Sequence, residues 1–250
     1  MSDATRSTDD AWLSVVIPAF DEVGRIGETA RRVCAYLSAQ SYAWEVLIVL
    51  DGGRPGAPEE IAEALGDRSH VRILDNHVNR GKGWSVRRGM LAARGRYRAF
   101  IDADLSLPID GMPTLIAALE RGADVAIGSR ALQASHITGH LAGFRTSMSH
   151  AFNVIVRFIT RCSLRDTQCG FKGFRGEAAH RIFRVQRLDR FGFDVEVLWL
   201  ARRFGYRIVE VPVTCHYHRA SSIRRVWDSW SMLLDLLRIR WYDRTGRYDR

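Results

Sequence analysis

The chain has 250 residues, 46% of them hydrophobic, which is enough for one large domain or two small ones around a substantial core. Its 37 Lys and Arg outnumber its 28 Asp and Glu, and the net charge of +9 favours an anionic partner: nucleic acid, a membrane surface or a phosphorylated ligand. The four cysteines are widely spaced without a C-x-x-C pair, which argues against a zinc site and a disulfide framework. The N-terminus is polar, which argues against a signal peptide, and no apolar run reaches the about 20 residues of a membrane-spanning helix.

The first half of the chain alternates between two kinds of segment. Residues 1–11 are polar and predict a disordered tail. After them, short runs rich in Val and Ile predict strands at 13–20, 45–50, 70–74, 97–102 and 124–130. Segments with helical periodicity lie between them at 26–37, 58–65, 83–95 and 112–122. This order predicts an α/β fold, a mostly parallel sheet flanked by helices.

Polar residues follow each of these five predicted strands. Because ligands bind at the carboxyl ends of the strands in such sheets, we expect the five loops to share one edge and one ligand. The residues in question are Asp21 and Glu22, Asp51 to Gly53, Asn79 to Gly83, Asp102 and Asp104, and Ser129 and Arg130.

The pattern changes after about residue 131. A basic helical stretch at 144–161 leads to the glycine-punctuated segment 166–176, a helix at 193–205, a strand at 207–213 and an amphipathic segment at 223–242. No Pro-rich or Ser-rich linker separates the two parts. We therefore treat 12–250 as one domain, with a donor-side half at 12–130 and an acceptor-side half at 131–222.

Asp102 and Asp104 are one residue apart at the end of the fourth predicted strand. At this spacing both carboxylates can present oxygens to one hard cation, Mg²⁺ or Mn²⁺, which can in turn hold a diphosphate. The alternative is an Asx-type turn with Pro108 and Gly111, in which the carboxylates only cap the next helix.

Seven ordered motifs carry a family resemblance: "VVIPAFDE", "VLDGG", "NRGKGWSVRRGM", "IDADLSLP", "GSR", "DTQCGFKGF" and "FGFDVEVLWLARRFGYRIVEVPV". From about residue 14 to 240 the chain resembles the family 2 glycosyltransferases of GT-A (Rossmann-like) fold, in the branch of polyprenyl-phosphate (dolichyl-phosphate) glucose and mannose synthases. The resemblance implies an inverting, metal-dependent enzyme that moves a sugar from a UDP-sugar such as UDP-glucose, or from GDP-mannose, to a polyprenyl phosphate.

The resemblance also implies roles for individual residues. The positions that match nucleotide-sugar contacts are Pro18, Ala19, Asp21, Glu22, Asp51, Gly81, Lys82, Asp102 and Ala103. Asp102 and Asp104 match the metal-binding pair. The acceptor-side positions are Arg130, Arg145, Asp166, Gln168, Lys172 and Arg219, of which the arginines suit a phosphate clamp. Asp104, Arg130 and Asp194 are the candidates for direct roles in the reaction, and Asp194 lies with Glu196 in the family's "FDxE" helix.

Three positions depart from the family pattern. Leu50 stands where the family usually has an aspartate, and Ser106 stands where mannose-type members often have Gln. After "VEVPV" a Gly-Ser-Lys-like turn is replaced by "TCHYHRASSIRR", so Arg219, Arg224 or Arg225 would substitute for a phosphate-binding lysine.

The role of Asp194 depends on the acceptor. A phosphate monoester is already largely ionised at neutral pH and needs positioning, whereas a hydroxyl acceptor needs a general base, for which Asp194 is the candidate. The alternative is that Asp194 pairs with Arg145 or Arg190 and only orders the site.

Two further patterns have open interpretations. His216 and His218 alternate as in a strand, so both share one face and either contribute to the metal or diphosphate site, with His218 as the metal ligand, or line a strand end. In 223–242, an apolar stripe with Trp227, Trp230 and Trp241 between flanking arginines suits a helix in a membrane interface, or one packed on the core or on a second subunit.

Other functions compete with this hypothesis. A soluble transferase that acts on a small-molecule or natural-product acceptor is the first alternative, and a non-catalytic nucleotide sensor, suggested by Leu50, is the second. Nucleic-acid binding is disfavoured because the basic residues are scattered and the strand-end carboxylates repel phosphate. We expect a cytoplasmic protein, soluble or peripheral to the cytoplasmic face of the membrane, with homo-oligomerisation left open.

Overall fold

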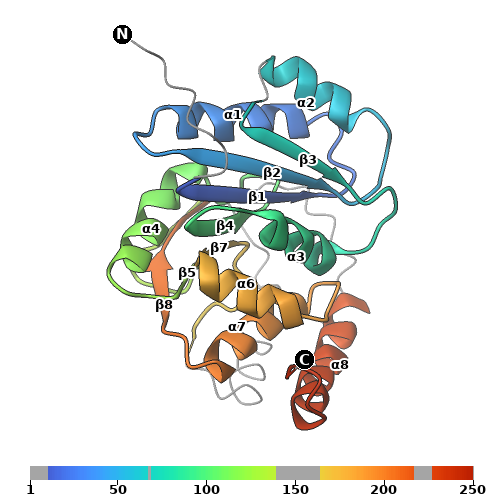
Figure 1. The fold of residues 1–250 in the computed structure, drawn as a ribbon, viewed down its shortest axis with the longest axis vertical. Coiled ribbons are helices and arrows are strands. Elements are labelled where there is room, and N and C mark those ends of the chain that lie inside the picture. Colours follow the sequence, from blue (N-terminus) through green and yellow to red (C-terminus); the bar gives the residue numbers. More distant parts are fainter. Residues whose placement is uncertain (1–10, 67–68, 139–163, 217–226, 250) are drawn as a thin grey trace.

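The computed structural model describes residues 11–66, 69–138, 164–216 and 227–249. Within these residues, seven strands form one sheet in the order β3-β2-β1-β4-β7-β5-β8 (Figure 1). They are β1 Leu13–Ala19, β2 Trp44–Leu50, β3 Val71–Asp75, β4 Tyr97–Ile101, β5 Val125–Ser129, β7 Phe171–Arg175 and β8 Ile208–Pro212. β7 is antiparallel to its neighbours β4 and β5, and the other pairs are parallel. The predicted mostly parallel sheet is confirmed.

Helices cover both faces of this sheet. On one face lie α1 Ile26–Ser38, α2 Ala57–Leu65 and α4 Met112–Glu120, the last preceded by the short 3₁₀ helix η2 Ile109–Gly111. On the other face lie α3 Lys82–Ala92, α6 Gly176–Val185 and α7 Phe193–Arg203. α8 Trp227–Arg244 contacts α7 (Figure 1).

The parallel strands β1, β2 and β5 are mostly apolar because both of their faces are buried. Val15 and Ile17 of β1 belong to the core under α1, whereas Val16 belongs to the core under α3. α3 approaches β1 so closely that a Cβ on Gly89 would overlap the Val16 side chain. The parallel register Val15↔Val46 and Val15↔Ala99 places the ends of β1, β2 and β4 at the same edge.

The strand β7 was not predicted. It lies in the centre of the sheet, yet its sequence FKGFR contains a lysine and a glycine in place of a continuous apolar run. Lys172 is fully buried there, where it pairs with Asp194. The lysine and the glycine interrupt the apolar run, so this strand has no hydrophobic periodicity to detect. The ionic partner of the lysine lies in another element and cannot be read from the strand itself.

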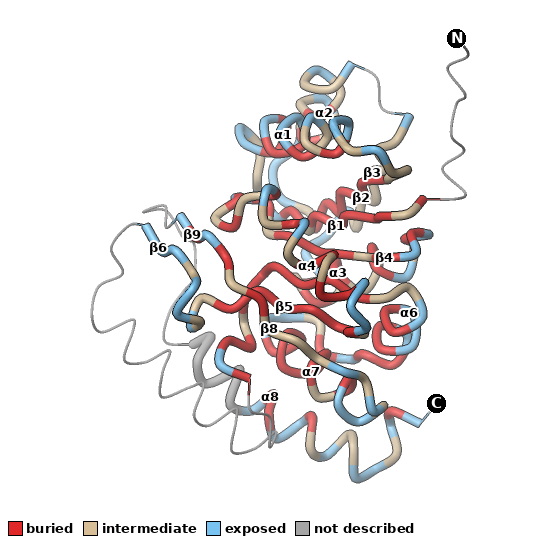
Figure 2. The backbone as a smooth tube through the Cα atoms, turned by 90° about the vertical axis from the view of Figure 1, so that its left-hand side faces the viewer, coloured by how far each residue is buried: buried red, intermediate tan, exposed pale blue. Residues whose placement is uncertain are grey.

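Two further strands, β6 His136–Thr138 and β9 Thr214–His216, form a separate parallel ribbon. Figure 2 shows the exposed β6 at one side of the molecule, beside β9. The ribbon joins the Asp102–Asp104 loop through one main-chain hydrogen bond, from His216 N to Ser106 O at 2.8 Å. The predicted segment 144–161 and the residues Arg145, His218, Arg219, Arg224 and Arg225 lie outside the described residues.

At both ends of the described chain the structure differs in detail from the predictions. Ala11, assigned to the tail, is buried, and its carbonyl accepts a hydrogen bond from Arg96 N. The C-terminal helix is present as α8. From residue 234 on, its apolar side chains lie on more than one side: Leu236 and Ile239 are buried, whereas Leu234, Leu237 and Trp241 are 50–58% exposed.

Candidate active site

Asp51 joins the loops that follow β1, β2 and β3. Its backbone N–H donates to Ala19 O at 2.8 Å. Its carboxylate, 3% exposed, accepts hydrogen bonds from Asn76 Nδ2 at 2.8 Å, Arg80 N at 2.9 Å and Gly81 N at 2.8 Å. Asp51 therefore organises the edge of the sheet. Asn76 was missed from the sequence, although it directly follows β3.

A narrow crevice lies between the ends of β1 and β2. Residues that line it include Ala19, Asp21, Glu22, Leu50 and Arg54, and its volume is about 10 Å³. Three of them match predicted nucleoside contacts, and Leu50 is the departure from the family pattern. Pro18, another predicted contact, is half-buried at the end of β1.

Asp21 and Arg54 form an exposed ion pair beside this crevice, with Arg54 Nε 2.7 Å from Asp21 Oδ1. Hydrogen bonds from the Arg54 side chain and backbone hold the pKa of Asp21 below its usual value. The backbone of Asp21 has a φ of 53°, and a Cβ on Gly53 would lie 2.8 Å from Asp21 N. The two loops thus cross at a position that requires a glycine.

Glu22 connects the crevice with the aspartate pair. It forms an ion pair with Arg25 at 2.5 Å. Burial raises the pKa of Glu22, Arg25 opposes this effect, and the carboxylates of Asp104 and Asp21 add to it. The negative charge of Asp104, in the loop after β4, therefore acts on the Glu22 carboxyl, in the loop after β1.

Lys82 is the first residue of α3, and its ammonium lies 2.6 Å from Asp102 Oδ1. Burial lowers the pKa of Lys82, but Asp102, Asp194 and Asp104 outweigh it and hold the pKa above its usual range. Lys82 is therefore cationic. On the other side of Asp102, a Cβ on Gly170 would overlap the carboxylate, so the glycine of "QCGF" is required for this packing.

Asp104 forms an Asx turn, in which Oδ1 accepts a hydrogen bond from Ser106 N at 2.9 Å. The predicted capping of the next helix by the carboxylates is wrong, because neither η2 nor α4 has a side-chain cap. Its second oxygen has no hydrogen-bond partner among the described residues. Thr29 of α1 fixes the loop by donating to Ala103 O at 2.7 Å. The turn and a metal site are compatible, because one oxygen of the exposed Asp104 is left for a ligand.

Within the described residues, no group of three or more His, Cys, Asp or Glu side chains is arranged to hold a metal ion. The donors at this edge are carboxylate oxygens, the type that Mg²⁺ and Mn²⁺ prefer. Such ions commonly take one or two carboxylates and complete their shell with substrate phosphates and water. Asp102 and Asp104 fit a site of this kind.

Asp194, at the start of α7, pairs with Lys172 Nζ, not with Arg190, so the partner proposed from the sequence is wrong for the described arginine. Lys172 also donates to Cys169 O at 2.8 Å and lies 5.4 Å from the centre of the Phe100 ring. Both charged side chains are almost completely buried. The described partner of Asp194 is thus a lysine of β7.

Arg130 and Asp166 form the third ion pair of the site. Arg130 donates from Nε to Oδ2 at 2.7 Å and from Nη2 to Oδ1 at 2.9 Å, a bidentate contact. Burial raises the pKa of Asp166, but Arg130, and to a smaller extent Lys172, hold it below its usual value. Gln168 is half-buried in the loop that follows. The pairs Arg130–Asp166, Lys172–Asp194 and Lys82–Asp102 thus influence one another across the sheet edge.

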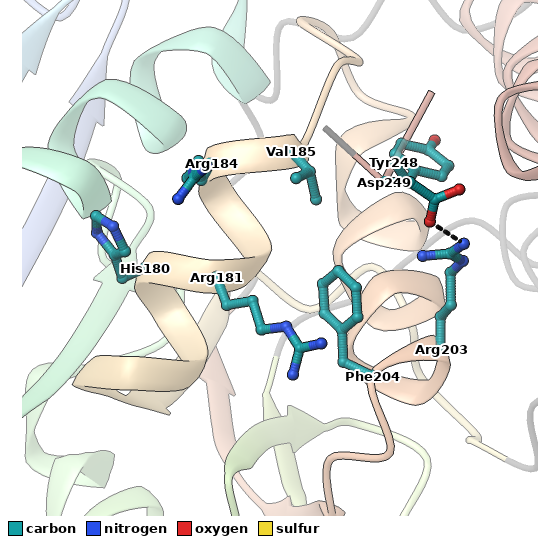
Figure 3. Close-up of a pocket in the computed structure, with 8 residues that line it drawn as sticks. All are labelled: His180, Arg181, Arg184, Val185, Arg203, Phe204, Tyr248 and Asp249. Atoms are coloured by element: carbon teal, nitrogen blue, oxygen red, sulfur yellow. Dashed lines mark hydrogen bonds and ion pairs between the residues drawn. The ribbon is translucent and has the colours of Figure 1, made fainter. Parts of the chain in front are cut away.

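A second hollow lies away from these residues. It has a volume of about 660 Å³ and lies between α6, the end of α7 and the C-terminal residues (Figure 3). Its lining residues are His180, Arg181, Arg184, Val185, Arg203, Phe204, Tyr248 and Asp249. None of the predicted site residues lines it, so size alone does not identify the active site.

No helix among the described residues is both long and apolar enough to cross a membrane.

Comparisons with known proteins identify the family of the chain. Residues 14–183 match the family model described as glycosyl transferase family 2. The chain is 35% identical over 243 residues to a dolichyl-phosphate beta-glucosyltransferase of Drosophila melanogaster, covering 91% of this chain and 74% of the relative. It is 31% identical over 254 residues to the protein of that name from Homo sapiens, covering 94% and 77%.

Solved structures share the fold. A glucosyl-3-phosphoglycerate synthase from Mycobacterium tuberculosis, in complex with Mn²⁺, UDP and glucosyl-3-phosphoglycerate, matches with a TM-score of 0.65 and 19% identity, over 92% of this chain and 80% of that one. Its complex with Mn²⁺ and UDP-glucose matches with a TM-score of 0.67 and 20% identity, over 92% and 79%. The GT-A fold expected from the motifs is thereby confirmed.

Proposed function

The chain belongs to glycosyl transferase family 2 and is a glycosyltransferase, and we propose that it transfers glucose from UDP-glucose, with inversion, to the phosphate of a polyprenyl phosphate. The observation that carries this proposal is the identity of about a third to dolichyl-phosphate beta-glucosyltransferases over more than 90% of the chain. We assign the donor to residues 12–130 and the acceptor to residues 131–222.

The donor site follows from the edge of the sheet. We assign the nucleoside to the crevice of Ala19, Asp21, Glu22 and Leu50, which the Asp21–Arg54 ion pair borders. Lys82 would then contribute a positive charge to the diphosphate. Asp104, with Asp102, would hold Mg²⁺ or Mn²⁺, which when bound neutralises the charge on the departing diphosphate.

The acceptor side requires positioning more than proton transfer. A phosphate monoester is largely ionised near neutral pH, so its oxygen attacks without a general base. The ion pair between Asp194 and Lys172 holds α7 against β7. Arg130, 31% exposed and oriented by Asp166, is the described arginine best placed to face the acceptor phosphate. Arg145, Gln168 and Arg219 remain further candidates for this phosphate.

We also propose that the protein contacts the cytoplasmic face of a membrane through α8. Leu234, Leu237 and Trp241 are exposed, and Arg238 beside them is 58% exposed. An exposed apolar side with neighbouring cations suits the interface of an anionic bilayer. The described cysteines are free thiols, as in a reducing compartment. Co-sedimentation with vesicles tests this, and a dimer in light scattering without vesicle binding would assign the same side to a second subunit.

The decisive experiment measures UDP release from UDP-glucose by the purified chain with Mn²⁺, with and without a short polyprenyl phosphate, followed by mass spectrometry of the lipid. We expect a lipid heavier by one hexose only in the complete mixture. GDP-mannose in place of UDP-glucose tests the donor. Transfer to 3-phosphoglycerate but not to the lipid would contradict the lipid acceptor and favour a soluble one.

A further inference from the structure

The start of α3, which carries Lys82, rests on the loop between α6 and α7. A Cβ on Gly81 would overlap the carbonyl oxygen of Asp189, and a Cβ on Gly83 would overlap that of Leu188. Trp84 N donates to Asp189 O at 3.1 Å. The two glycines that flank Lys82 therefore serve close backbone contact, and the position of Lys82 depends on the loop at 186–193.

This loop is fixed in turn by Glu196 of α7. The Glu196 carboxylate is fully buried and accepts hydrogen bonds from Arg187 N at 3.0 Å and Leu188 N at 2.8 Å. A third hydrogen bond comes from Tyr248 Oη at 2.7 Å. Glu196 thus connects the C-terminal residues to the backbone on which Gly83 rests.

The C-terminal residues touch the same loop at two further points. The Arg187 guanidinium donates to Arg247 O from Nε at 2.9 Å and from Nη2 at 2.7 Å. A Cβ on Gly192 would lie 2.5 Å from Asp235 Oδ2 of α8. The loop is therefore held from the C-terminal side at Arg187, Leu188 and Gly192.

The segment that carries Tyr248 has its own anchor. Arg203 forms ion pairs with Asp249 Oδ1 at 2.6 Å and with Asp243 Oδ1 at 2.6 Å. Figure 3 marks the Arg203–Asp249 pair. Tyr248 is 1% exposed, and its ring packs edge-on against Tyr242 at 5.9 Å. Burial, and then the Glu196 carboxylate, raise the pKa of Tyr248, so its hydroxyl stays a hydrogen-bond donor.

We propose that Tyr248 is a positioning residue for the nucleotide-sugar donor: through Glu196 it holds the 187–189 backbone in the arrangement that presents Lys82 to the diphosphate. The proposal rests on the proposed function, since it needs a UDP-sugar as the ligand of Lys82. Tyr248 itself touches neither donor nor acceptor in this scheme. Its hydroxyl sets the fraction of molecules in which the loop at 186–193 holds Lys82 in position to bind the diphosphate of the donor.

The test compares Tyr248→Phe with Tyr242→Phe in the full chain. Both changes remove one hydroxyl from the same aromatic cluster, but the Tyr242 hydroxyl has no hydrogen-bond partner among the described residues. If loss of the Tyr248 hydroxyl lowers the competent fraction to about a tenth, UDP should bind about tenfold more weakly by calorimetry with Mn²⁺. Tyr242→Phe should bind UDP like the wild type.

Hydrogen exchange supplies a readout that a general loss of stability would not produce. In Tyr248→Phe, peptides that cover 80–86 and 186–193 should exchange faster, while a peptide from β2 keeps its wild-type rate. If Tyr248→Phe does not fold, Asp249→Ala, which removes an exposed partner of Arg203, should weaken UDP binding in the same direction by a smaller factor.

The outcomes separate the two proposals. Equal UDP affinities for the wild type and Tyr248→Phe would overturn the positioning role and leave the proposed function intact, as would equal weakening in Tyr242→Phe. A wild-type protein that binds neither UDP nor UDP-glucose would contradict the proposed function itself.

Discussion

The ammonium of Lys82 lies 2.6 Å from Oδ1 of Asp102, so the lysine predicted to meet the donor diphosphate is the counter-ion of an aspartate predicted to hold the metal. Both side chains are partly exposed, and Asp104 and Asp194 add to the negative field around the lysine. We therefore expect a divalent cation and Lys82 to compete for this carboxylate.

Lys82→Gln should separate metal binding from turnover. Without the competing ammonium we expect Mn²⁺ alone to bind about fivefold more tightly, and with one less cation on the leaving diphosphate we expect kcat/KM for UDP-glucose to fall about 10²-fold. Paramagnetic titration of Mn²⁺ and steady-state kinetics measure the two effects. Arg31→Gln, which removes an exposed α1 cation paired with Glu28, is the control. Weaker Mn²⁺ binding in Lys82→Gln would contradict the competition.

Asp104→Asn should remove metal-dependent turnover while the protein stays folded. The substitution keeps a carbonyl oxygen to accept the Ser106 N–H but removes the charge that a divalent ion requires, so we expect activity to fall by about 10²-fold or more. Asp110→Asn, at an exposed position in η2, is the matched control and should retain activity. Wild-type turnover by Asp104→Asn in Mn²⁺, or no loss of wild-type activity with a chelator, would refute the assignment.

Local patterns in the sequence predicted the parallel strands and the edge where Asp21, Asp51 and Asp102 lie, because burial on both faces leaves uninterrupted apolar runs that end in polar loops. They did not predict the partners of buried charges. Lys172 lies in a central strand where periodicity fails, and its pairing with Asp194 depends on how β7 and α7 pack. Asp51 is a second example: the motif matches it to a nucleoside contact, but in the structure its carboxylate oxygens accept hydrogen bonds from the protein's own backbone.

Asp194→Asn tests whether this residue is a base or an ordering group. It keeps an oxygen that can accept from Lys172 but leaves the buried ammonium without its paired negative charge, which should lower the free energy of unfolding by about 3–5 kcal/mol in denaturant titrations. The double variant Lys172→Met, Asp194→Leu should recover most of that loss, because it removes both charges.

Activity of folded Asp194→Asn then identifies the acceptor. With a phosphate acceptor we expect a loss below about tenfold, since no proton has to be removed. A loss of about 10²-fold or more at a temperature where the variant is fully folded would indicate a base acting on a hydroxyl and would contradict the polyprenyl phosphate.

Glu196 should give the protein a pH-dependent stability between about pH 4.5 and 7. Burial raises the pKa of Glu196 to about 7, against the hydrogen bonds from Tyr248, Leu188 and Arg187, whereas the ordinary value for the unfolded chain is 4.5. In this window the native state binds more protons than the unfolded state, so the stabilisation is complete below pH 4.5 and is lost as the pH rises through 7. Integrated over the window, it amounts to at most about 3 kcal/mol.

Glu196→Gln isolates this effect. Glutamine does not titrate, so the free energy of unfolding of the variant should be flatter from pH 5 to 8 than that of the wild type, whatever the change in its absolute value. Asp235, whose pKa burial also raises, is present in both proteins and largely cancels in the comparison. Denaturant titrations at four pH values measure the difference. Equal slopes for the two proteins would mean that the three donors keep Glu196 ionised throughout, and the link from Tyr248 to the loop would then be charge-assisted at every pH.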